Sequence, residues 1–242
     1  MLWSRYLLHL LVAGVGFVAP QLEADPGLEL KPFAAKFQVT RSNIPLGTLD
    51  LRLDLTADGG YNYTGHTKPG AIIRWLISDE VHESSRGTYA DRQIVPLTYE
   101  FLQSNGEVKK KTLLKFDWKT EKVWTTSEGT RWSQKLSPGM HDKFSQQLAL
   151  RLELSGGAKT ASYPVADGGR IKTYYYKVEG SDSINLPYGR LNCLKVKRNK
   201  ENHPPDYTIW FAPELDYLPV KIERKRSSGH YTIELMQLTE SR

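Results

Sequence analysis

The chain has 242 residues, a formal net charge of +6 at pH 7 and one cysteine. This length suits one domain with a full hydrophobic core, and the apolar share of 39% is too high for a disordered chain. A single cysteine excludes an intrachain disulfide framework, a paired-cysteine redox motif and a cysteine-based zinc knuckle.

The first 24 residues have the pattern of a secretory signal peptide. A short basic start precedes an almost continuous apolar stretch at 6–18, and the small residues Ala19 and Ala24 both suit a cleavage site. A buried helix or a membrane anchor is the alternative, but the stretch is shorter than the ~20 residues of a membrane span and Pro20 ends it. We expect cleavage near Ala24.

The mature chain is therefore expected to be one β-rich domain over residues 25–242, in an oxidising compartment outside the cytoplasm. No cysteine follows the apolar run, which argues against a lipid-anchored lipoprotein. Cys193 has no partner cysteine within the chain, and we expect it to be a small buried side chain rather than a reactive thiol.

Most of the domain alternates apolar and polar residues with a period of two, which is typical of strands with one buried face. The clearest example is 49–55, where four leucines alternate with charged residues, and the turn Asp58-Gly59-Gly60 follows it. This pattern predicts a mainly β fold with a single curved antiparallel sheet, either a half-barrel or a spiral. Further strands are expected at 33–40, 114–118, 174–178, 207–211, 218–222 and 231–235.

One segment is predicted to be an amphipathic helix of about four turns. Apolar residues recur every four positions from Met140 to Leu152. Ser137-Pro138 offers a cap and a first-turn proline, and Gly156-Gly157 ends the run. We expect this helix to pack its apolar face against the concave side of the sheet.

The segment 69–78 also interrupts the strand pattern, because its apolar residues occur in adjacent pairs. A short helix or a loop packed on the core is one interpretation. The other is a mobile apolar flap or a membrane-touching loop, since Trp75 lies beside Arg74.

The basic residues are spread along strands and are not gathered into one patch. In 194–197 and 220–223 each charge adjoins an apolar residue, and the densest run, Lys109–Lys111, follows the turn signal Asn105-Gly106. We interpret these charges as the solvated face of the sheet; attraction to an anionic membrane surface or an acidic polysaccharide is the alternative. No nucleic-acid partner is expected for an exported chain.

Catalytic and cofactor signatures are missing from the sequence. There is no GxSxG, GxxxxGK[ST] or GxGxxG motif, and His82-Glu83 lacks the second histidine of HExxH. We therefore expect no enzymatic activity, no cofactor and no metal site. The alternative is an envelope hydrolase or sugar-active enzyme using Asp79, Glu80 or Glu83, although neighbouring residues on a strand point to opposite faces.

Four short motifs resemble one family. They are Leu46-Gly47 after the opening strand, Asp142–Ser145, Leu186–Gly189 and the closing hairpin Trp210–Glu223. Together they resemble the exported proteobacterial domain-of-unknown-function family 3108. The resemblance implies a periplasmic protein of no established activity, with a strongly curved antiparallel sheet holding a helix. This outline is similar to that of periplasmic lipoprotein carriers and envelope-integrity proteins.

The resemblance also implies a structural role for Asp142 and Ser145, whose side-chain oxygens would cap the helix.

These observations favour a non-enzymatic envelope protein that binds an apolar or lipid ligand, or an envelope protein partner, in the hollow of the curved sheet. The alternative is that the helix fills the hollow and leaves a dry core. The candidate ligand-binding residues are Trp75, Phe116, Trp118, Met140, Phe144 and Leu148.

Overall fold

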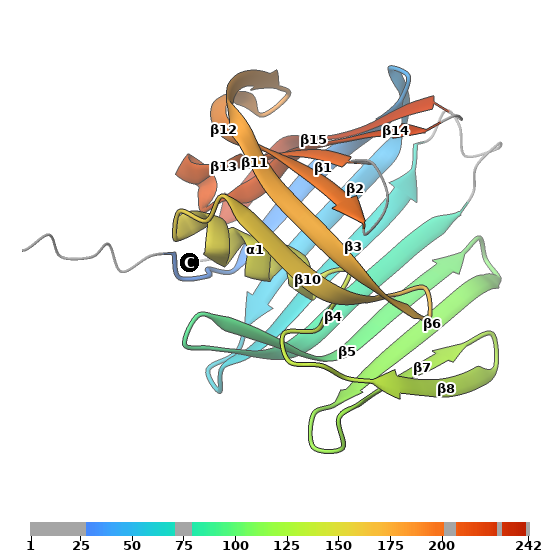
Figure 1. Cartoon of the computed structure of the whole chain (residues 1–242). Coiled ribbons are helices and arrows are strands. Elements are labelled where there is room, and N and C mark those ends of the chain that lie inside the picture. Colours follow the sequence, from blue (N-terminus) through green and yellow to red (C-terminus); the bar gives the residue numbers. More distant parts are fainter. Residues whose placement is uncertain (1–27, 71–78, 201–206, 227–228, 241–242) are drawn as a thin grey trace, which may run out of the picture.

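The computed structural model describes residues 28–70, 79–200, 207–226 and 229–240. Over these ranges the chain forms one sheet of 15 strands, antiparallel except for one strand pair, together with one α-helix and one 3-10 turn. The prediction of a mainly β fold with a curved sheet around a helix is confirmed. Figure 1 shows the sheet curling around the helix.

Two predictions concern residues outside the described ranges: the signal peptide at 1–24, and the segment around Trp75. No helix within the described ranges is long and apolar enough to cross a membrane.

The first eight strands form an antiparallel meander in which each strand pairs with the next. Tight turns join several of them: Ser42 and Asn43 have φ of 48° and 67°, the two positive values that a type I′ hairpin turn requires. The strands are β1 (Phe33–Arg41), β2 (Ile44–Leu55), β3 (Gly60–Pro69), β4 (Glu80–Ala90), β5 (Gln93–Ser104), β6 (Val108–Asp117), β7 (Lys122–Ser127) and β8 (Thr130–Lys135).

The remaining strands extend the same sheet from the edge of β1 that is not paired with β2. Strand β1 pairs with β15, so the first and last strands meet in the middle, and β8 and β9 are the edges in the described part of the chain. Strand β9 runs parallel to β10. These elements are β9 (His141–Asp142), β10 (Thr160–Asp167), β11 (Arg170–Leu186), β12 (Gly189–Lys200), β13 (Tyr207–Ala212), the 3-10 turn η1 (Pro213–Leu215), β14 (Leu218–Arg226) and β15 (Gly229–Glu240).

The helix α1 (Ser145–Ser155) lies between the two halves of the curled sheet. Leu148 and Leu152 belong to the larger core cluster, which contains residues from both halves of the sheet, whereas Leu150 and Leu154 belong to a second cluster on β10–β13. Positions two apart on a helix point about 200° away from each other, so these leucine pairs face opposite ways. The helix is therefore buried on both sides.

This placement corrects the predicted helix in two respects. The helix begins at Ser145 rather than after Ser137-Pro138, because His141 and Asp142 form strand β9. It is also not amphipathic in the expected sense, since Glu153 is its one exposed residue in the described structure. Buried polar groups on it find partners instead: Arg151 donates two hydrogen bonds to the carbonyl of Asp216, at 2.9 and 3.1 Å.

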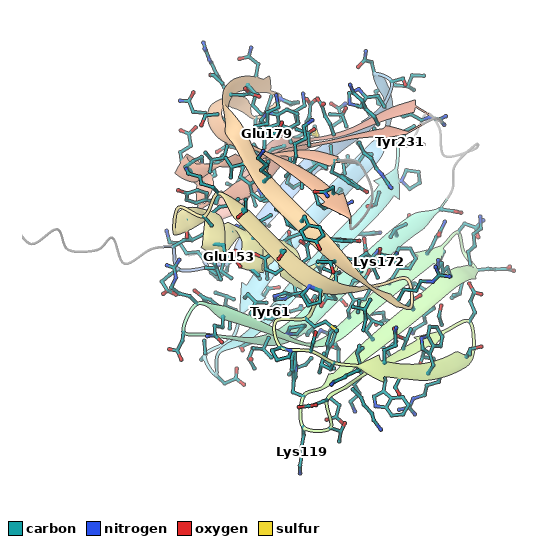
Figure 2. The ribbon with its side chains drawn as sticks, viewed as in Figure 1. Tyr61, Lys119, Glu153, Lys172, Glu179 and Tyr231 are labelled. Atoms are coloured by element: carbon teal, nitrogen blue, oxygen red, sulfur yellow. The ribbon has the colours of Figure 1, made fainter. Side chains whose placement is uncertain are left out.

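The core is filled by large side chains from alternate positions of the strands. In Figure 2 Tyr61 lies inside, near the helix, whereas Lys119 points away from the molecule at the turn between β6 and β7. Cys193 is 1% exposed, and burial raises the pKa of its thiol to about 11. The expectation of a small buried cysteine is confirmed.

Candidate functional site

A cavity of about 420 Å³ opens on the concave side of the sheet, beside the start of α1. We call it the concave cavity. Its apolar walls come from strands of both halves of the sheet and from the residue that precedes the helix. The apolar lining includes Phe37, Leu49, Phe144, Ile209, Ile222 and Ile233.

A cluster of arginine and tyrosine side chains borders one end of the concave cavity. The register of β12 and β13 places Arg198 opposite Tyr207, and the guanidinium carbon of Arg198 lies 3.7 Å from the centroid of that ring. The same guanidinium lies 4.5 Å from the ring of Tyr174, and Arg224 lies 4.7 Å from that of Tyr207. Stacking of this kind is worth about 0.5–2 kcal/mol per contact and holds the guanidinium groups in place.

The polarity of the cavity changes along these strands. Tyr207 begins β13, and Ile209 and Phe211 follow it on the same face of the strand. On the neighbouring antiparallel strand β14, Arg224 lies at the same end as Tyr207, and Ile222 lies further from that end. The lining therefore changes from cationic and aromatic at these strand ends to apolar further along.

A second charged group borders the cavity near the helix. The ammonium of Lys143 lies 3.0 Å from Glu83 Oε1, and the hydroxyl of Tyr99 donates a hydrogen bond to the same carboxylate oxygen. Burial, and then the charge of Glu83, raise the pKa of Tyr99, so this phenol remains a donor at neutral pH. Glu83 is thus held by two partners.

A third group lies on β10 and β11. Asp167 accepts hydrogen bonds from the ammonium of Lys172 at 2.7 Å and the hydroxyl of Tyr174 at 2.8 Å. Burial alone would raise the pKa of Asp167, but these two hydrogen bonds outweigh it and lower the pKa. Among the described residues that line the cavity, three are basic (Lys143, Arg198 and Arg224) and two are acidic (Glu83 and Asp167). The lining therefore favours an anion.

A buried carboxylate fixes the start of the helix and thereby Phe144 in the cavity wall. Asp142 Oδ1 accepts the backbone N–H groups of Phe144 and Ser145 at 2.7 and 2.8 Å, and Oδ2 accepts the hydroxyl of Ser85 at 2.7 Å. The hydroxyls of Ser85 and Tyr61 are 3.0 Å apart. Asp142 satisfies early backbone donors of the helix, which is the capping role that the resemblance implied.

Residues 36–236 match the model of the family DUF3108, which is described as a protein of unknown function. The chain belongs to the DUF3108 family. No curated protein matches it.

Two solved structures are similar to this DUF3108 chain. A β-barrel-like protein of domain of unknown function DUF1849 from Brucella abortus has a TM-score of 0.59 at 12% identity, over 88% of this chain and 99% of that one. An exported protein with a YmcC-like fold from Bacteroides fragilis, described as putative, has a TM-score of 0.34 at 11% identity, over 87% and 97% of the two chains. The similarity to the DUF1849 protein shows a shared fold.

The residues predicted to bind a ligand lie in different parts of the DUF3108 structure. Phe116, Met140 and Leu148 are at most 3% exposed and belong to the packed core. Trp118 is half-buried, donates its indole N–H to the carbonyl of Pro96 at 2.8 Å, and lines with Met140 a separate hollow of about 630 Å³. Of the five described candidates, Phe144 alone lines the concave cavity.

The residues that sequence reasoning missed are the arginines of the concave cavity. The pattern in 194–197 predicts a solvated face, and this prediction fits Lys195 and Lys197, whose side chains are 35% and 34% exposed. Arg198, however, is in phase with the apolar Leu194 and Val196, which pack in the second core cluster. The sequence itself indicates that Arg198 shares the face of Leu194 and Val196, because side chains two residues apart on a strand point the same way.

The acidic cluster at 79–83 is divided between the two faces of the sheet. Asp79 accepts a hydrogen bond from Gln103 at 2.7 Å and pairs with Lys109, and Glu80 lies 3.0 Å from His66. Glu83 reaches the concave cavity. Glu80 and Glu83 therefore do not face each other across one cleft, as a carboxylate pair in glycoside hydrolysis must.

Proposed function

We propose that this DUF3108 protein is a non-enzymatic binding protein that holds an amphipathic anion, with an apolar chain and an acidic head, in the concave cavity. The observation that carries the proposal is the polarity of the lining, with Arg198 and Arg224 at one end and apolar walls beyond them. A guanidinium presents a fork of donors that matches a carboxylate or phosphate, so these two side chains suit an acidic head group.

The dimensions of the cavity support the same ligand class. Its volume of about 420 Å³ lies within the ~300–1,000 Å³ typical of small-molecule pockets, which are mostly apolar with a few placed polar groups. Phe37, Leu49 and Phe144 supply the apolar contact for a hydrocarbon chain. The division of Glu80 and Glu83 between two faces favours binding over the alternative of an envelope hydrolase.

The proposed site of action is the cell envelope, outside the cytoplasm, with cleavage near Ala24. The basic and apolar pattern of the first 24 residues supports this assignment. N-terminal sequencing of the protein recovered from fractionated cells tests it: the expected first residue is Asp25 in the periplasmic fraction. Recovery of the full-length chain in the cytoplasm would contradict it.

The ligand class is tested by displacement of a fluorescent fatty acid, cis-parinaric acid, from delipidated protein. Oleate is expected to compete and the neutral oleyl alcohol to compete at least 10-fold less well, because the alcohol lacks the charge that the arginines bind. Native mass spectrometry of protein purified without detergent is expected to show a co-purified anionic lipid. Absence of saturable probe binding would refute the proposal and would leave the packed-core or protein-partner alternatives.

Two variants distinguish binding in the concave cavity from adventitious binding elsewhere on the protein. Arg198→Gln is expected to weaken oleate binding by at least 10-fold. Arg190→Gln is the matched control: it lies on the same strand β12, and its guanidinium donates to Ser183 Oγ at 2.9 Å on the exposed surface. Equal losses in both variants would show that binding is not placed in the concave cavity.

A further inference from the structure

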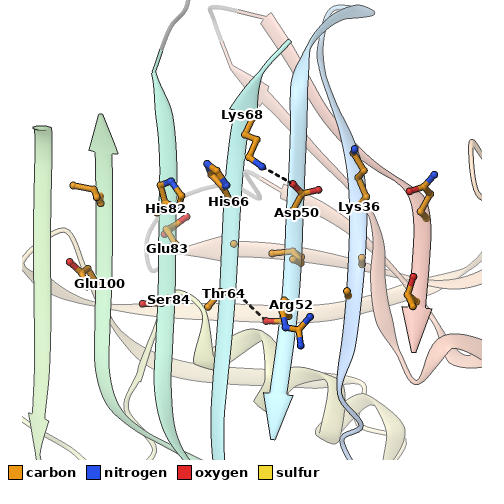
Figure 3. A pocket seen from close by; sticks show the side chains of 17 residues that line it. Lys36, Asp50, Arg52, Thr64, His66, Lys68, His82, Glu83, Ser84 and Glu100 are labelled. Carbon is orange, nitrogen blue, oxygen red and sulfur yellow. Dashed lines mark hydrogen bonds and ion pairs between the residues drawn. The ribbon is translucent and has the colours of Figure 1, made fainter. Parts of the chain in front are cut away.

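Two histidines lie opposite each other on the convex face of the sheet. The antiparallel register pairs His66 of β3 with His82 of β4, and their ring centroids are 3.6 Å apart with planes inclined by 25°. Figure 3 shows the two side chains next to each other at a shallow hollow. Their chain neighbours Thr67 and Glu83 line the concave cavity, so the histidines point to the opposite face.

A carboxylate completes this group. Glu80 precedes His82 by two positions and shares its face of β4, and Glu80 Oε2 lies 3.0 Å from His66 Nε2. One donor atom from each of the three residues lies within 4.8 Å of the other two. Bonds from zinc to imidazole nitrogen and carboxylate oxygen are about 2.0–2.2 Å long, so two donors on one ion lie about 3–4 Å apart. The three donor atoms are therefore close to the spacing that a single ion requires.

We propose that His66, His82 and Glu80 form a binding site for a divalent transition-metal ion of the zinc class. Imidazole nitrogen suits Zn²⁺, Cu²⁺ and Ni²⁺ better than it suits Mg²⁺ or Ca²⁺, which require mostly oxygen ligands. Two histidines and one carboxylate leave at least one coordination position for water or for a group from another molecule. The proposal is independent of the proposed ligand binding, since the two sites lie on opposite faces of the sheet.

The surroundings make the site accessible and set a limit on its affinity. The side chains of His66 and Glu80 are 25% and 37% exposed, so an ion can reach them without opening the fold. Lys68 lies on the same face of β3 and repels a cation. Its ammonium is 3.5 Å from Asp50 Oδ2, and this carboxylate offsets part of the repulsion.

The test uses the full chain without a histidine tag, stripped of metal with a chelator and titrated with Zn²⁺ by calorimetry. One-to-one binding is expected, and His66→Gln and His82→Gln are each expected to weaken it at least 10-fold. Titration with Co²⁺ gives a second measurement, because strong visible d–d bands appear when protein ligands replace water and lower the coordination number of the ion. These bands are expected in the wild type and are expected to be lost in both variants.

His230→Gln is the matched control. It removes a histidine from another His–Glu pair on neighbouring strands, in which His230 Nε2 lies 3.4 Å from Glu223 Oε2. Its affinity for Zn²⁺ is expected to equal that of the wild type. Glu80→Gln keeps the shape of the site and is expected to weaken binding several-fold. Failure of the wild type to bind Zn²⁺ stoichiometrically would overturn the proposal, as would equal affinity of the wild type, His66→Gln and His82→Gln.

Discussion

The two faces of strand β3 meet different environments, although their residues alternate along one short sequence. On the concave face Tyr61 and Tyr63 are at most 3% exposed and pack toward the helix, with Gly65 next to them. On the convex face His66 and Lys68 are partly exposed and interact with carboxylates. One strand therefore supplies both a close-packed wall and a polar surface. Because side chains alternate between the two faces, an odd or even position decides which environment a residue meets.

The largest expected effect is the loss of packing between helix and sheet. Leu148 is 0% exposed and lies in the larger core cluster, to which both halves of the sheet contribute. Leu148→Ala is expected to lower the free energy of unfolding by about 2–5 kcal/mol, because it removes buried apolar contact and leaves a cavity. Urea denaturation of both proteins measures this difference. A change below about 1 kcal/mol would show that the helix is not a close-packed part of the core.

The second expected effect is a pH dependence that originates at the buried side chain of His141 in strand β9. His141 is 5% exposed, and burial lowers its pKa to about 4. The unfolded chain takes up a proton near the ordinary histidine pKa of ~6.5, whereas the folded chain does not. The contribution of this group to stability is therefore present above that pH and is lost as the pH falls toward 4.

Between pH 7.5 and pH 5 this group is expected to lower the free energy of unfolding by about 2 kcal/mol. Urea denaturation at the two pH values measures the change. In His141→Gln the difference between the two pH values is expected to shrink by that amount. A variant with the full wild-type pH dependence would show that His141 is not its source.

The third prediction uses two consecutive residues on opposite faces of β3. A Cβ atom at Gly65 would lie 2.7 Å from Phe144 Cζ, so Gly65→Ala must displace that ring from the wall of the concave cavity. A loss of about 1 kcal/mol is expected. Thr64→Ala changes the convex face and is expected to stay within about 0.5 kcal/mol of the wild type. Equal effects of the two substitutions, measured by thermal unfolding, would contradict the contrast between the faces.

The smallest expected effect is on the convex face in the absence of metal. His66→Gln is expected to change the free energy of unfolding by no more than about 0.5 kcal/mol, because the side chain is partly exposed. With Zn²⁺ at ~100 times the dissociation constant, the wild type is expected to gain about 2.7 kcal/mol. His66→Gln is expected to gain far less. Thermal unfolding with and without Zn²⁺ compares the two, and an equal gain would contradict the contribution of His66.

The sequence predicted the sheet well because its period of two is a local property. The alternation in 49–55 depends on one buried face, and β2 has that pattern. The sequence places the start of the helix too early because Met140 and Phe144 are both buried but flank the short strand β9, which precedes the helix. A spacing of four residues could not distinguish these positions from helical ones.

The candidate sites depend on contacts between distant segments, which local patterns do not reveal. Arg198 and Arg224 meet at Tyr207 through the pairing of three strands. His66 and His82 lie 16 positions apart and face each other through the register of one hairpin. A motif with helical spacing, such as HExxH, therefore cannot reveal this pair of histidines.

The pairing of β1 with β15 has a consequence for folding. Phe33 is opposite Glu240, about 200 positions away in the chain, and this contact joins the two halves of the sheet. The hairpins on either side can form early from neighbouring residues, but the chain must close this long loop before the halves meet. We therefore expect folding to be slow for a domain of this size, with the arrival of the last strand as its late step.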